Sequence, residues 1–299
     1  AMFSQNVQLH DHRPASDIFF GLNPTFDVVF LVCSFFLQSQ SSFYGAMCIC
    51  QCATIMRLVY HNSVPNRRSL SGRIVGGEET EIENYPYQLS LEYFYIHNCG
   101  ASIISNDWAL TAAHCLQNKH KILIRLRAGS STRGEGGTLH SASEIIVHPN
   151  HNNKTQDCDI AVIKVGEPFV YGPTIQPISL VTTEPSVGDL ATVTGWGLTS
   201  VKGSLSSQLK VVFIPIIDHY ECISDYLHMY SVTNNMICAA NEESGQDACN
   251  ADSGGPMVIG GKQVGIVSWG ESCGDPKYPG VYTNIALLRD FVVNTTGIE

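Results

Sequence analysis

From residue 74 onward, hydrophobic residues occur in short runs that are separated by polar turns. Runs of about four to eight residues rich in Val, Ile and Leu, bounded by Gly, Pro, Asn or Asp, are typical of β-strands. The expected strands are 88–91, 121–128, 160–165, 190–194, 211–217, 262–269 and 281–285. Apolar residues at helical spacing appear only near the end, where residues 287–292 predict a C-terminal helix. Short strands with Gly- and Pro-containing connections indicate an all-β sandwich or barrel.

The first 73 residues follow a different pattern. A mostly apolar run spans 28–37, which is shorter than the roughly 20 residues that a membrane helix needs. Its length suits the core of a secretory signal, although Asp27 stands where a basic residue is expected. We therefore expect residues 1–73 to be a signal and propeptide region that is largely disordered or removed. The alternative is a membrane anchor formed by residues 28–60, which we consider the weaker interpretation.

The charge is unevenly distributed along the chain. The net charge is −10, and residues 74–299 carry 12 basic against 24 acidic side chains. Nucleic-acid binding requires a basic surface, so this balance argues against a nucleic acid as partner. Eleven cysteines, seven of them after residue 74, favour an oxidising compartment. Their spacing alone leaves several disulfide pairings open.

Three motifs that suit nucleophilic catalysis occur in the order His, Asp, Ser. They are AAHC at 112–115, DIA at 159–161 and DSGGP at 252–256. A serine hydroxyl is a weak nucleophile by itself and needs a neighbouring base. We therefore expect Ser253 to be the nucleophile, His114 the general base and Asp159 the carboxylate that orients the imidazole. Other histidines, such as His148 and His151 in a Pro- and Asn-rich loop, are expected to be solvated.

With these motifs and RIVGG at 73–77, residues 74–299 resemble the trypsin family of serine proteases. The resemblance implies two six-stranded antiparallel β-barrels, an active site in the cleft between them and a C-terminal helix on one barrel. It also implies a secreted, extracellular and monomeric serine endopeptidase that acts on proteins and peptides and is open to protein inhibitors. No cofactor is expected. The loop that binds calcium in some members corresponds to 129–138, which offers only Glu135, so no metal is expected either.

The resemblance also implies a disulfide pattern. The pairs are Cys99–Cys115, Cys222–Cys238 and Cys249–Cys273, a set of three that resembles arthropod trypsins. Each local bridge would stabilise the fold by roughly 2–4 kcal/mol. Cys158 is left over, and we expect it to be a small buried apolar residue.

The expected substrate pocket follows from the same resemblance. Asp247 lies where trypsin-like members place the carboxylate at the floor of the primary specificity pocket. A carboxylate there would pair with a guanidinium or ammonium group of the substrate. Ser268, Gly270 and Gly280 match further substrate-binding positions, and the two glycines leave room for a long side chain. Cleavage after Arg or Lys is therefore expected.

Activation by proteolysis is a further implication. Cleavage between Arg73 and Ile74 would free an α-amino group, which in the family pairs with the aspartate before the nucleophile, here Asp252. The chain would then be made as a zymogen that becomes ordered on cleavage.

One position departs from the family pattern. Ala251 stands where a glycine supplies a backbone N–H to the oxyanion hole, together with the N–H of Ser253. Alanine keeps the N–H group, so we expect a working oxyanion hole. The alternative is a catalytically weakened protease homologue that acts as a binding or cofactor protein.

Overall fold

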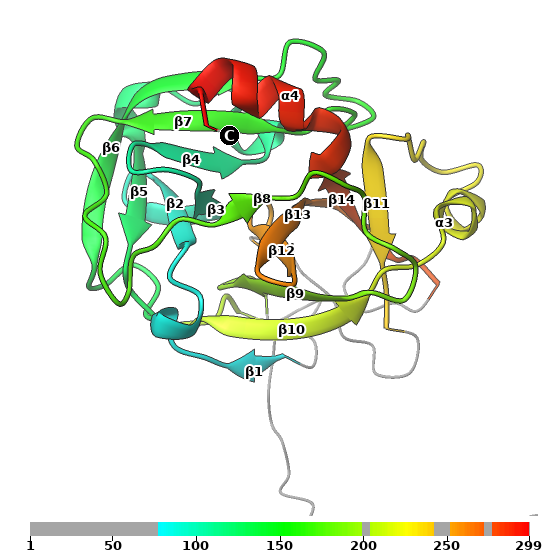
Figure 1. Cartoon of the computed structure of the whole chain (residues 1–299), viewed down its shortest axis with the longest axis horizontal. Helices are drawn as coiled ribbons and strands as arrows, with labels where there is room; N and C mark the ends of the chain where they lie inside the picture. The colour runs from blue at the N-terminus through cyan, green and yellow to red at the C-terminus, as the bar shows by residue number, and fades with distance from the viewer. Residues whose placement is uncertain (1–76, 199–203, 242–251, 272–276, 299) are drawn as a thin grey trace, which may run out of the picture. The chain divides into compact units, whose positions relative to one another are not determined.

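Two β-sheets form the framework of residues 77–198, 204–241, 252–271 and 277–298, the parts of the chain that a computed structural model describes (Figure 1). The first sheet is a closed barrel with the strand order β2-β3-β4-β7-β6-β5, and every neighbouring pair is antiparallel. Its strands are β2 (Gln88–Tyr93), β3 (Ile96–Ile103), β4 (Trp108–Thr111), β5 (Ile124–Ala128), β6 (Thr138–Val147) and β7 (Ala161–Val165).

Alternating side chains build the interior of this barrel. In β5, Ile124, Leu126 and Ala128 are fully buried, whereas Arg125 and Arg127 are only half-buried. This alternation is that of a strand with one face toward a core. The apolar runs in the sequence therefore mark the inward face of the barrel.

The second sheet has the strand order β1-β10-β9-β12-β13-β14-β11, and β8 pairs in parallel with β13. Its strands are β1 (Glu78–Glu79), β8 (Ser179–Leu180), β9 (Leu190–Gly195), β10 (Lys210–Pro215), β11 (Met236–Ala239), β12 (Pro256–Ile259), β13 (Lys262–Trp269) and β14 (Gly280–Asn284). A single bridge between Ile216 and Ala239 joins the two ends of the six antiparallel strands from β10 to β11. The predicted all-β, two-barrel architecture is thus confirmed. Among the described residues, this bridge closes the second sheet, which has eight strands because the short strands β1 and β8 extend the expected six-stranded barrel.

Buried polar side chains connect the two sheets. Thr194 in β9 donates a hydrogen bond of 2.6 Å to the side-chain oxygen of Gln88 in β2. Ser102 in β3 donates a bond of 2.6 Å to the side-chain oxygen of Gln263 in β13. Buried polar groups of this kind fix the relative position of the sheets because each would be costly to leave unpaired.

The predicted C-terminal helix is confirmed as α4 (Ile285–Thr296), with Ile285, Leu288 and Val292 buried. These three side chains belong to the same apolar core as the first barrel, and Figure 1 shows α4 beside β7. Asn284 caps the start of the helix, where its side chain accepts a hydrogen bond from the N–H of Ala286. Within the described part of the chain, no helix is long and apolar enough to cross a bilayer.

A second helix, α3 (His219–Asp225), contradicts the prediction that nothing before the C-terminus is helical. Asp218 caps it by accepting hydrogen bonds from the N–H groups of Tyr220 and Glu221. The helix buries only Cys222, so its apolar pattern is too short to detect. Asp218 followed by Glu221 three residues later is nevertheless an N-terminal helix signal.

Candidate active site

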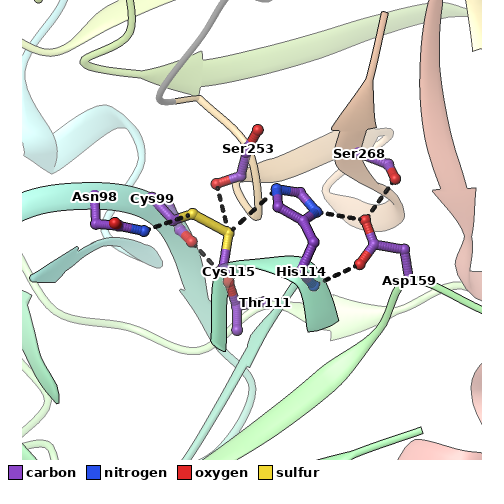
Figure 2. Close-up of a disulfide and its surroundings, with 9 residues drawn as sticks. Asn98, Cys99, Thr111, His114, Cys115, Asp159, Ser253 and Ser268 are labelled. Atoms are coloured by element: carbon purple, nitrogen blue, oxygen red, sulfur yellow. Dashed lines mark hydrogen bonds and ion pairs between the residues drawn. A yellow bond between two sulfur atoms is a disulfide. The ribbon is translucent and has the colours of Figure 1, made fainter. Parts of the chain in front are cut away.

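His114 and Asp159 meet at one end of the first barrel. His114 lies in the 3-10 helix η2 (Ala113–Leu116) just after β4, and Asp159 lies just before β7. Because β4 and β7 pair with Thr111 opposite Ala161, the two flanking segments come together. His114 Nδ1 is 2.7 Å from Oδ2 of Asp159, and the His114 backbone N–H donates to Oδ1 at 2.9 Å (Figure 2).

The Asp159 carboxylate is fully buried but well supplied with hydrogen-bond donors. Ser268 Oγ donates to Oδ2 at 2.6 Å, and Thr283 Oγ1 donates to the Asp159 backbone oxygen at 2.8 Å. Burial raises the pKa of Asp159, but the hydrogen bond and charge of His114 and the Ser268 bond outweigh it and hold the pKa below its ordinary value. Asp159 is therefore an anion that holds the proton of the imidazole on Nδ1.

Ser253 lies in a short loop before β12 and is half-buried. The N–H of Gly100 in β3 donates to the Ser253 carbonyl at 2.8 Å, and the N–H of Gly254 donates to Val267 in β13 at 2.7 Å. Gly254 has a φ of 81°, and a Cβ there would overlap Oγ1 of Thr111. Glycine is required after the serine because any larger residue would displace the loop from both sheets.

The imidazole lies between Asp159 and Ser253 (Figure 2). Sγ of Cys115 is 3.7 Å from His114 Nε2 and 3.6 Å from the Ser253 carbonyl oxygen. Among the described residues, no hydrogen bond joins the side chains of Ser253 and His114. In free enzymes such bonds are often long and tighten only when substrate binds.

Two predicted disulfides, Cys99–Cys115 and Cys222–Cys238, are formed. Cys99 and Cys115 lie close to His114. Because their sulfurs are bonded to one another, the group is not a thiolate metal site. Cys158 is a free, buried thiol, as predicted. Burial, followed by the charge of Asp157, raises its pKa to about 11, so it is unreactive at neutral pH.

The expected substrate-binding positions lie along β13 and β14. Ser268 is buried and bound to Asp159, so its hydroxyl supports the carboxylate. Trp269 pairs with Val281, which places Gly270 and Gly280 at the same end of these neighbouring strands. The remaining predicted residues lie outside the described part of the chain: Arg73, Ile74, Asp247, Cys249, Ala251 and Cys273.

Asp252 is 1% exposed and is held by two glycines that are not among the predicted site residues. Its Oδ1 accepts a hydrogen bond of 2.8 Å from the N–H of Gly197. A Cβ on either Gly195 or Gly197 would overlap the carboxylate. The signal in the sequence is Gly195-Trp196-Gly197, which marks a strand end where another segment approaches closely.

The expectation that His148 and His151 are solvated is wrong. The His151 side chain is 5% exposed, and its Nδ1 lies 4.0 Å from Oδ1 of Asp159. His148 is half-buried, with its ring 4.8 Å from that of Phe291 in α4. Polar loop composition predicted exposure, but the loop packs against the catalytic end of the barrel.

Two β-sheets that hold a histidine–aspartate pair beside a serine, in this chain order, define the chymotrypsin-like serine endopeptidases. Comparison with known proteins gives the same class. The family model for trypsin matches residues 74–292, and the chain therefore belongs to the trypsin family.

Individual relatives are similar over most of their length. Trypsin delta of Drosophila melanogaster is 43% identical over 227 residues, which cover 75% of this chain and 89% of the relative. Trypsin alpha-4 of Lucilia cuprina is 41% identical over 253 residues, covering 84% and 97%. The vitellin-degrading protease of Bombyx mori is 39% identical over 243 residues, covering 81% and 91%. The chain is a trypsin-like serine endopeptidase with protein or peptide substrates.

Proposed function

We propose that the enzyme cleaves peptide bonds after Arg or Lys, with Ser253 as nucleophile, His114 as general base and Asp159 as the orienting carboxylate. The observation that carries this proposal is the hydrogen-bonded set of Ser268, Asp159 and His114 beside Ser253. Asp247 supports the basic specificity through its position in the sequence.

We assign each step of acyl transfer to one group. Ser253 Oγ attacks the scissile carbonyl while His114 Nε2 takes the hydroxyl proton, and the resulting imidazolium gives that proton to the leaving amine. Asp159 accepts the Nδ1–H throughout, which fixes the tautomer that leaves Nε2 free. Water then attacks the carbonyl of the acyl-enzyme with His114 as the base, and Ser253 leaves with the proton that His114 returns. The backbone N–H groups of Ser253 and Ala251 are the proposed oxyanion donors.

Activation and location belong to the same proposal. Cleavage between Arg73 and Ile74 would release the α-amino group that pairs with Asp252, a buried carboxylate already held by Gly197. The two disulfides favour an oxidising compartment, which supports secretion. We propose that the mature enzyme is a monomer that protein inhibitors can block.

The test uses protein cleaved after Arg73 and matched peptide amides ending in Arg, Lys, Phe or Leu. We expect turnover of the Arg and Lys amides and its loss in Ser253→Ala. Equal turnover of all four substrates would contradict the proposed specificity for Arg and Lys. Activity that persists in Ser253→Ala would show that Ser253 is not the nucleophile.

A further inference from the structure

His151 lies against the Asp159 oxygen that the His114 ring does not bind. Its Nδ1 is 4.0 Å from Oδ1, whereas His114 Nδ1 is 2.7 Å from Oδ2. The His151 side chain is 5% exposed, so the ring shields this oxygen from water. The carboxylate is therefore flanked by two imidazoles, and the proposed mechanism uses only one of them.

Gln117 sets the tautomer of His151. Its amide Nε2 is 3.0 Å from Nε2 of His151 and 2.9 Å from Oδ1 of Asn153. An amide NH₂ group donates, so His151 Nε2 accepts and the neutral ring carries its proton on Nδ1. That N–H faces the carbonyl oxygen of Asp157 at 3.3 Å and then Asp159. The positive end of the N–H dipole is thus turned toward the catalytic carboxylate.

Gln117 also connects the His151 ring to the general base. It is the C-cap residue of η2, and its backbone N–H donates to the His114 carbonyl oxygen at 3.4 Å. The side-chain bond to His151 therefore joins the turn that carries His114 to the loop that precedes Asp159. We propose that His151 is a positioning residue, which holds η2 against Asp159 and tunes the charge that Asp159 presents to His114. This inference rests on the proposed function of that pair.

Protonation of His151 would undo the arrangement. A proton on Nε2 replaces the acceptor with a second donor facing the Gln117 amide, so this bond is lost. The ring would also place a positive charge near Asp159, where it competes with the His114 imidazolium for the same carboxylate. Full activity therefore requires that both imidazoles be neutral at the start of the reaction.

Two further ionisable residues, Asp157 and His148, lie next to His151 through contacts of their backbone oxygens. Burial raises the pKa of Asp157, but hydrogen bonds from Thr233 and Asn235, of 2.6 and 3.0 Å, outweigh it and lower the pKa. Burial also lowers the pKa of His148, against a smaller opposing effect of Asp157. Asp157 therefore remains anionic, and His148 neutral, to a lower pH than their ordinary pKa values would allow.

The test is the pH dependence of kcat/KM for the enzyme cleaved after Arg73, with an Arg peptide amide as substrate. For the natural sequence, log(kcat/KM) should fall in acid with a slope approaching about two, because two protons inactivate. His151→Phe keeps a planar aromatic ring at this position and removes both nitrogens. It should lower kcat about tenfold, leave KM within about twofold and reduce the slope to about one.

Two more variants complete the test. Gln117→Met removes the amide donor at similar length and should change the profile in the same direction, so it decides the matter if His151→Phe does not fold. Asn153→Ala removes the other partner of Gln117 and should keep the natural profile. If His151→Phe and Gln117→Met keep the kcat and the slope of the natural protein, the inference is overturned. A lower kcat with an unaltered slope would also overturn it, because lost packing alone would produce that result. Ser253→Ala separately tests the proposed function, since residual activity there refutes the triad whatever His151 does.

Discussion

The two sheets hold their parts of the active site in different ways. The closed first barrel positions His114 and Asp159 through hydrogen bonds of 2.7 and 2.9 Å that involve the Asp159 carboxylate. The second sheet positions Ser253 through backbone bonds and through glycines that let segments touch. A side chain can rotate and keep its contact when the backbone shifts slightly. Backbone atoms that touch each other have no such freedom, so a small shift breaks or crowds the contact. Changes on the first side should therefore impair chemistry while the fold survives, and changes on the second should displace a whole loop.

The largest effect is expected from Asp159→Asn on the first-barrel side. The amide would stabilise the wrong tautomer of His114, and kcat should fall about 10⁴-fold, the loss typical of this change in serine proteases. Asp107→Asn is the matched control, because Asp107 pairs with Lys164 at the surface and lies outside the site. Steady-state kinetics of both variants with an Arg peptide amide checks the prediction. A loss below about tenfold for Asp159→Asn would show that the carboxylate does not orient the base.

On the second-sheet side, Gly254→Ala should displace the nucleophile loop. The new methyl group would overlap Thr111 and lie 2.6 Å from the Gly100 carbonyl oxygen. We expect kcat to fall about 10²–10³-fold, as for the loss of an oxyanion donor. Gly260→Ala is the control, because it has the same sign of φ (56°) but open space around its Cβ. It should cost about 1–2 kcal/mol of unfolding free energy and leave kcat unchanged. Equal kinetics for the two variants would contradict the close-contact argument.

The two disulfides sharpen the comparison because both span 16 residues. Replacing either pair by alanines should lower the free energy of unfolding by about 3 kcal/mol, as expected for loops of this length. Only the loss of Cys99–Cys115 should also lower kcat, because Cys115 lies beside His114 and Cys222–Cys238 lies away from it at α3. Urea unfolding and kinetics at one pH separate the two effects. A similar kcat loss for both pairs would mean that stability alone controls activity.

The smallest effect concerns acid stability. The folded pKa of Asp159 is lowered from an ordinary value near 3.9. Its contribution is therefore fully present above about pH 4 and is lost as the pH falls through the lower folded pKa. Urea unfolding should accordingly show a shallower loss of stability below about pH 4 in Asp159→Asn than in the natural protein. Parallel curves would mean that the Asp159 pKa is not lowered on folding.

Sequence patterns anticipated the strands whose inward faces are continuously apolar, such as β5 and β13. They did not anticipate β3, whose sequence IHNCGASI combines small and polar residues because Gly100 must approach Gly255. Helix α3 was missed because a helix with a single buried side chain has no apolar stripe. For β3, the deciding factor is a contact with a segment far away in the chain.

Sequence predicts the site residues that lie in short motifs, and it does not predict those that tertiary packing brings to the site. The motifs around His114, Asp159 and Ser253 named the residues, but their proximity depends on the pairing of β4 with β7. His151 was assigned to solvent because its neighbours in the sequence are polar. Its ring nitrogen contacts Gln117, a residue 34 positions earlier, and no local pattern reveals this contact.

The most direct test of the central claim is covalent labelling of the enzyme cleaved after Arg73 with a fluorophosphonate, followed by mass spectrometry of the peptides. The account predicts one adduct, on Ser253, which forms far more slowly in His114→Ala and Asp159→Asn. Absence of an adduct on Ser253 in protein with a confirmed Ile74 terminus, or equal labelling in the variants, would contradict the proposed catalytic set.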